Sequence, residues 1–124
     1  MALEWISRPD AQLAARVRGD GPVVVLLHGF PDTFETWCGA GEETDERVGA
    51  EDHLVREGYR TVALALRGYA PSEPSANEDY SLRALAEDPV ATLDHFNAER
   101  GLVVGHDWGA SVRPRFTRTA SRAW

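Results

Sequence analysis

An aspartate in the middle of a glycine-flanked pentapeptide is the residue of this sequence best placed to do chemistry. Residues 105–109 read Gly-His-Asp-Trp-Gly, and the apolar residues 102–104 before them predict a buried strand. This is the pattern of a nucleophile elbow, in which a tight turn between strand and helix presents the middle residue, here Asp107. Gly105 and Gly109 would let strand and helix pass closely. A carboxylate in that place suits displacement of a leaving group from saturated carbon, which forms an ester that water can split.

A second chemistry-bearing segment follows an aliphatic run. Residues 23–27 (Val-Val-Val-Leu-Leu) are typical of a parallel strand buried on both faces, and they lead into a loop that begins His-Gly-Phe-Pro. Gly29 permits close backbone approach, while Pro31 fixes the turn and is a candidate for a cis peptide bond. Loops that leave the carboxyl ends of central strands are where doubly wound sheets bind ligands.

A third segment, residues 67–72 (Arg-Gly-Tyr-Ala-Pro-Ser), follows another strand-like run at 61–66. In this order, the three motifs resemble the epoxide hydrolase branch of the α/β-hydrolase fold, near the haloalkane dehalogenases. The resemblance covers roughly residues 3–110. It implies that the chain takes a small-molecule epoxide or similar electrophile as substrate and needs neither a cofactor nor a metal ion.

The resemblance also implies a role for each motif residue. Asp107 is the expected nucleophile, which forms an alkyl-enzyme ester. The backbone N–H groups of Phe30 and Trp108 are the expected oxyanion donors in the hydrolysis of that ester. The remaining motif residues are expected to support the loops: His28, Gly29, Pro31 and His106.

The leaving group is the point on which the two nearest activities differ. A dehalogenase must donate hydrogen bonds to a halide, and the position after His28-Gly29 often supplies one of them in that branch. Here the position holds Phe30, whose side chain has no donor. This favours an epoxide, with a haloalkane dehalogenase-like hydrolase as the alternative.

The order of predicted elements indicates an α/β fold. Strands are expected at 3–6, 12–17, 23–27, 61–66 and 102–104, with a helix at 81–96. We predict the N-terminal part of an α/β-hydrolase fold, with a mostly parallel doubly wound sheet and with the cap domain and C-terminal strands absent. Within the helix, Ser81 is the expected N-cap, Pro89 is expected to kink it or end its first half, and Gly101 is expected to stop it.

Residues 111–124 differ in kind from the rest of the chain. They carry four arginines and no acid, a charge of +4, whereas residues 1–110 carry a charge of −11. We therefore predict two parts, a partial hydrolase core over 1–110 and an atypical basic tail over 111–124, consistent with a shifted reading frame. No Asp, Glu or His follows Asp107, so the acid and histidine that complete the family's site are missing from this sequence.

Composition limits the surroundings in which the chain works. The net charge of −7 argues against a nucleic-acid partner. No apolar stretch is long enough to span a membrane, and a single cysteine fits a reducing compartment, so a cytoplasmic location is expected.

Three hypotheses follow from the sequence. The chain is a portion of an epoxide hydrolase-like enzyme that needs a complementing C-terminal chain, an inactive remnant of such an enzyme, or a binding protein that reuses the half-sheet.

Overall fold

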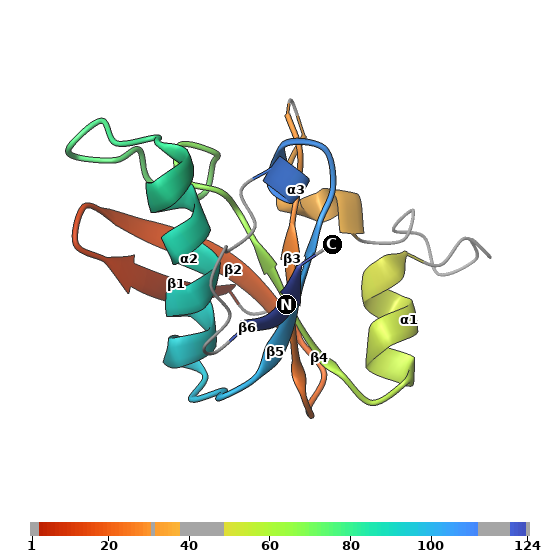
Figure 1. The fold of residues 1–124 in the computed structure, drawn as a ribbon. Coiled ribbons are helices and arrows are strands. Elements are labelled where there is room, and N and C mark those ends of the chain that lie inside the picture. The colour runs from red at the N-terminus through yellow and green to blue at the C-terminus, as the bar shows by residue number, and fades with distance from the viewer. Residues whose placement is uncertain (1–2, 31, 38–48, 112–119, 124) are drawn as a thin grey trace.

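A six-stranded sheet forms the centre of the computed structural model, which describes residues 3–30, 32–37, 49–111 and 120–123 (Figure 1). The strands lie in the order β1-β2-β4-β3-β5-β6. Their bounds are β1 Leu3–Arg8, β2 Ala11–Arg18, β3 Val23–Leu27, β4 Arg60–Leu64, β5 Gly101–Gly105 and β6 Ala120–Ala123. β1 pairs with β2, and β2 with β4, in antiparallel fashion, whereas β4, β3, β5 and β6 are parallel. The predicted mostly parallel sheet is confirmed.

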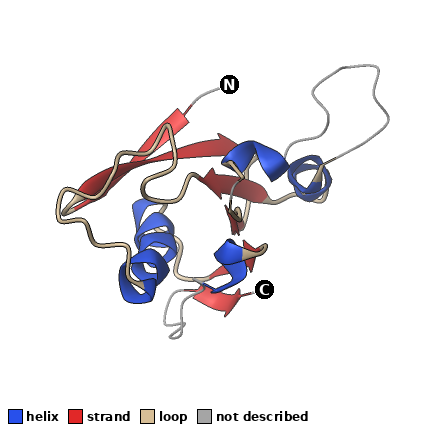
Figure 2. Cartoon of the chain, turned by 90° about the horizontal axis from the view of Figure 1, so that it is seen from above, coloured by secondary structure: helices blue, strands red, loops and turns tan. Residues whose placement is uncertain are grey.

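Helices cover both faces of this sheet. α1 (Ala50–Arg56) lies on one face and α2 (Leu82–His95) on the other, a separation also visible from above (Figure 2). Two shorter elements, η1 (Phe34–Trp37) and α3 (Trp108–Ser111), follow β3 and β5 along the chain. The sheet is therefore doubly wound, as its near-continuous aliphatic central strand predicts.

The core divides into two layers because successive residues of β3 point to opposite faces. Val25 and Leu27 pack in the cluster that contains Leu93 of α2. Val24 and Leu26 pack in the second cluster, which contains Phe34 of η1. All five residues of β3 are buried, so this strand has no face turned to solvent.

Helix α2 begins where the sequence predicts and continues past Pro89, where the sequence predicts a kink or an end. The Ser81 hydroxyl accepts a hydrogen bond from the Ala84 N–H at 3.2 Å, which confirms the predicted cap. The expected end of the first half near Pro89 was wrong, because one helix runs through that residue, while the expected kink stays a prediction. Pro89 lies on the buried face, and the preceding Asp88 is fixed by ion pairs to two arginines, so tertiary contacts offset the missing backbone hydrogen bond.

The end of α2 is also set differently from the prediction. Asn97, with φ of 53°, takes the left-handed conformation after the helix, a place we had expected Gly101 to mark. Gly101 is instead the first residue of β5. A Cβ atom there would lie 2.4 Å from Cδ2 of Leu93, so the glycine serves close packing of helix on strand.

A buried ion pair joins β2 to α1. Arg16 is 1% exposed and Glu51 is fully buried. The Arg16 Nε donates to Glu51 Oε1 at 3.0 Å. The Arg16 Nη2 contacts Glu51 Oε2 and donates to the Phe34 carbonyl at 3.2 Å. Each charge is thus neutralised and hydrogen-bonded, which burial of a charge requires.

The last strand was not predicted from the sequence. β6 pairs in parallel with β5, with an irregularity between Gly101 and Leu102, and it falls within the segment we expected to be an atypical tail. Its four residues carry no apolar pattern of a buried strand.

Within the described residues, none of the helices is both long and apolar enough to cross a membrane.

Candidate active site

Three loops meet at the carboxyl edge of the parallel strands. Leu27, at the end of β3, pairs with Leu64 of β4 on one side and with Gly105 of β5 on the other. Because the three strands run in the same direction, the segments that follow them emerge at the same edge. These segments carry the three sequence motifs, so the fold brings all three together.

Asp107 occupies a tight connection between β5 and α3. Its φ is 56°, in the left-handed region that non-glycine residues adopt at a cost of about 1–3 kcal/mol. The turn is closed by hydrogen bonds from Gly109 N–H to the His106 carbonyl at 3.0 Å and from Ala110 N–H to the Asp107 carbonyl at 3.1 Å. Asp107 is exposed, so the strained backbone presents a carboxylate at the surface of this edge.

Close backbone approach explains the glycines around this turn. A Cβ atom at Gly109 would lie 2.2 Å from the Leu27 carbonyl oxygen, and one at Gly105 would lie 2.5 Å from the Gly109 carbonyl oxygen. At Gly29 the added atom would lie 2.6 Å from Cβ of Asp107. The absence of a Cβ atom at Gly105 and Gly109 lets α3 cross over the strand ends. Its absence at Gly29 lets the loop after β3 reach Asp107.

The loop after β3 contacts Asp107 through its backbone. The Phe30 N–H donates to Asp107 Oδ2 at 3.1 Å, while the Phe30 side chain is 68% exposed. Trp108 is the first residue of α3, where backbone N–H groups have no partner within the helix. Pro31, expected to support this loop, lies outside the described residues.

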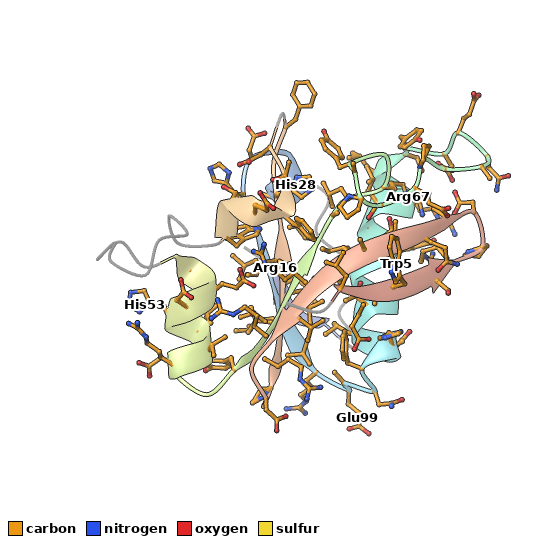
Figure 3. All side chains as sticks on the ribbon, turned by 180° about the vertical axis from the view of Figure 1, so that it is seen from behind. Trp5, Arg16, His28, His53, Arg67 and Glu99 are labelled. Carbon is orange, nitrogen blue, oxygen red and sulfur yellow. The ribbon has the colours of Figure 1, made fainter. Side chains whose placement is uncertain are left out.

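His28 is buried at the end of β3 (Figure 3). Its Nε2 accepts a hydrogen bond from the Leu66 N–H at 3.1 Å, so its Nδ1 carries the proton and donates to the Gly29 carbonyl at 2.9 Å. Burial lowers the pKa of His28 below its ordinary value. β4 ends at Leu64, two residues before the prediction, and the Leu66 N–H bonds to this side chain.

Two residues that the sequence analysis did not single out also line this edge. The ring of Tyr69 packs edge-on against His28 with centroids 4.8 Å apart, and burial followed by the charge of Asp107 raises its pKa. Asp32 accepts a hydrogen bond from the Thr33 N–H at 2.8 Å, which lowers its pKa. Tyr69 belongs to the Arg-Gly-Tyr motif, and that motif is the sequence feature from which its place at this edge could have been predicted. Asp32 has no such feature, because it looks like an ordinary turn residue.

His106 contributes through its backbone. Its N–H donates to the Leu27 carbonyl at 3.1 Å, and its carbonyl accepts from Gly109 in the turn described above. Its side chain is exposed.

A charged network fixes the loop after β4. Arg67 (Figure 3) is 2% exposed and donates to both carboxylate oxygens of Asp88, each at 2.8 Å, and to Asp10 at 2.9 Å. The Asp88 hydrogen bonds raise the pKa of the guanidinium, so its charge is permanent. Ser72, the last residue of the motif, accepts from the Ala14 N–H at 2.8 Å and donates to the Ala65 carbonyl at 2.6 Å. The motif therefore holds the Tyr69 loop in place.

Comparison with known proteins agrees with this geometry. Residues 22–112 match the family model described as the alpha/beta hydrolase fold. The chain belongs to the α/β-hydrolase fold family. Epoxide hydrolase B of Mycobacterium tuberculosis is 42% identical over 107 residues, which cover 86% of this chain and 25% of that protein. The AB hydrolase superfamily protein YfhM of Bacillus subtilis is 39% identical, with coverage of 81% and 32%.

Solved structures of epoxide hydrolases superpose on this α/β-hydrolase chain. The enzyme from an endophytic Streptomyces gives a TM-score of 0.74 at 30% identity, covering 90% of this chain and 31% of that one. Potato epoxide hydrolase I gives 0.72 at 29% identity, covering 90% and 33%. The matched region thus spans about a quarter to a third of the relatives' length.

Among the described residues, no three His, Cys, Asp or Glu side chains are grouped so as to hold a metal ion.

Proposed function

We propose that this chain is the nucleophile-bearing portion of an epoxide hydrolase, with Asp107 as the nucleophile. The observation that carries the proposal is the hydrogen bond from the Phe30 N–H to Asp107 Oδ2 at 3.1 Å. It joins two of the predicted motifs in one site and orients an exposed carboxylate on a strained turn. The similarity to epoxide hydrolases supports the same substrate class.

The first step is a displacement at saturated carbon. A carboxylate oxygen of Asp107 attacks one carbon of the epoxide, forming the ester C–O bond. The ring C–O bond breaks, and its electron pair passes to the ring oxygen, which takes a proton from water when this chain acts alone. The product is a hydroxyalkyl ester on Asp107.

The second step is hydrolysis of that ester. Water attacks the carbonyl carbon of Asp107, and the resulting oxyanion accepts hydrogen bonds from the N–H groups of Phe30 and Trp108. Loss of one such donor raises a barrier of this kind by about 3 kcal/mol. Water then needs a base, and the sequence has no Asp, Glu or His after Asp107. We propose that a complementing segment supplies the acid and histidine, so on this chain alone the ester accumulates.

Intact-mass spectrometry tests this proposal. We expect incubation with styrene oxide at neutral pH to add one hydroxyalkyl group per chain, and Asp107→Asn to abolish the addition. Asp32→Asn is the matched control, because it removes a second carboxylate at the same edge and should leave the addition intact. Equal addition to the wild type and to Asp107→Asn would refute the role of Asp107.

A further inference from the structure

The Gly29 carbonyl and the Phe30 N–H belong to the same peptide unit. A peptide unit is planar, and in its trans form the C=O and N–H point in opposite directions. Whatever holds the Gly29 carbonyl therefore also sets the direction of the Phe30 N–H, which donates to Asp107 Oδ2. The orientation of the oxyanion donor is thus decided on the side of the peptide away from Asp107.

Among the described residues, two donors hold the Gly29 carbonyl. One is the His28 Nδ1 at 2.9 Å, and the other is the Asp32 N–H at 3.0 Å. The Asp32 contact lies within the turn and moves with it. The His28 contact is anchored elsewhere, because the same imidazole accepts from the Leu66 N–H of the loop after β4 and packs against the Tyr69 ring. His28 is fully buried, so water does not compete for these contacts.

We propose that His28 is the positioning residue that aims the Phe30 N–H, in its neutral form with the proton on Nδ1. The proposal rests on the proposed function, since the N–H acts on the ester formed at Asp107. Hydrogen bonding to the carbonyl also polarises the peptide, which strengthens its N–H as a donor. The function of the imidazole is then to orient and polarise one peptide unit, without taking a proton from the substrate or from water.

Two substitutions divide the two contacts of His28. Asparagine places an amide N–H near the position of Nδ1, so His28→Asn keeps a donor for the Gly29 carbonyl and loses the acceptor for Leu66. Glutamine places its amide oxygen near the position of Nε2, so His28→Gln keeps the acceptor and loses the donor. If His28 only filled space, or only tied β3 to β4, the glutamine variant would be the milder one.

The test measures how fast a preformed ester is cleaved. Each variant is alkylated on Asp107 with styrene oxide, freed of reagent and exposed to hydroxylamine, a nucleophile that replaces water and needs no base to activate it. The nitrogen of hydroxylamine attacks the ester carbonyl, the C–N bond forms, the ester C–O bond breaks, and the diol leaves with the proton. We expect cleavage about tenfold slower in His28→Gln and within about twofold of wild type in His28→Asn.

Equal cleavage rates in all three proteins, or a slower rate only in His28→Asn, would overturn the proposal. Nitrogen-15 NMR of the wild type adds a test that requires no variant: a proton on Nε2 of His28 would also overturn it, and a proton on Nδ1 supports it. The Phe30 amide proton shift should be kept in His28→Asn and move upfield in His28→Gln. Absence of any ester on the wild type would refute the proposed function, and the NMR measurements would still decide the role of His28.

Discussion

The Phe30 N–H and the Asp107 carboxylate, 77 positions apart in the sequence, meet at 3.1 Å. The contact exists because β3 and β5 are parallel neighbours whose carboxyl ends share one edge of the sheet. Gly29 and Gly109 let the connecting backbones approach closely enough for it to form. A loop and a turn that separately carry weak signals thereby become one site.

Gly29 should tolerate no side chain. In Gly29→Ala, the added methyl would lie 2.6 Å from Cβ and 2.8 Å from Oδ2 of Asp107, so the carboxylate must move. Because misplacing a reacting group by about 1 Å costs on the order of 100-fold, ester formation should slow by about that factor. The measurement is the rate of mass addition by styrene oxide.

Gly58→Ala is the control for this change. Gly58 has φ of +93° and nothing near its missing Cβ, so alanine strains the backbone far from Asp107. It should lower the free energy of unfolding by about 1–3 kcal/mol without changing the rate of addition. A parallel loss of rate in both variants would mean that the effect of Gly29→Ala is general destabilisation.

Gly109→Ala should destabilise the fold itself. Its methyl group would lie 2.2 Å from the carbonyl oxygen of Leu27, which is backbone in the central strand and has little room to move. We expect the free energy of unfolding to fall by about 1–3 kcal/mol, measured by urea denaturation. The neighbouring Ala110→Gly should cost about 1 kcal/mol or less, and a larger effect there than at Gly109 would contradict the packing argument.

Breaking the buried pair of Arg67 and Asp88 should cost more than breaking an exposed one. Arg67→Met leaves the fully buried Asp88 carboxylate with only one of its two arginines, and loss of a partner in a buried pair typically costs about 3–5 kcal/mol. Arg83→Ala removes an exposed pair with Glu87 and should change the free energy of unfolding by less than about 0.5 kcal/mol. Thermal and urea unfolding of both variants compare the two directly. Similar losses would show that the buried network has no special weight.

Acid should remove part of the stability through His28. Burial lowers the pKa of His28 in the folded chain below its ordinary value of 6.5, so the unfolded chain takes up the proton first. The contribution of neutral His28 to the free energy of unfolding is fully present above pH 6.5. It is lost as the pH falls through the pKa that His28 has in the folded chain. The wild type should therefore lose more stability than His28→Gln between about pH 7.5 and pH 5. Parallel losses in the two proteins would count against a buried neutral imidazole.

Much of the fold could be predicted because its signals are local. The aliphatic run that forms β3 and the Ser81 cap of α2 follow from adjacent residues and their spacing, and both lie where predicted. Pro89 misled the prediction that the helix ends there, because local propensity favours an end, while the buried ion pairs at Asp88 and the packing of the helix outweigh it.

The motif residues of the candidate site could be selected from the sequence, whereas the long-range contacts around them could not. The strand-to-turn pattern singled out Asp107, which has a positive φ in the structure. The pairing of Arg16 with Glu51, and the packing of Tyr69 on His28, join residues distant in sequence that have no shared pattern. Such contacts depend on how the strands are ordered, which only the assembled sheet determines.

The central claim is that a carboxylate oxygen of Asp107 is the nucleophile that attacks an epoxide. Peptide mapping by tandem mass spectrometry, after brief exposure to styrene oxide, tests it most directly. We predict the hydroxyalkyl group on the carboxylate of Asp107, released as a diol by hydroxylamine. An adduct located instead on Asp32, His106 or another side chain, with Asp107 unmodified, would contradict the account.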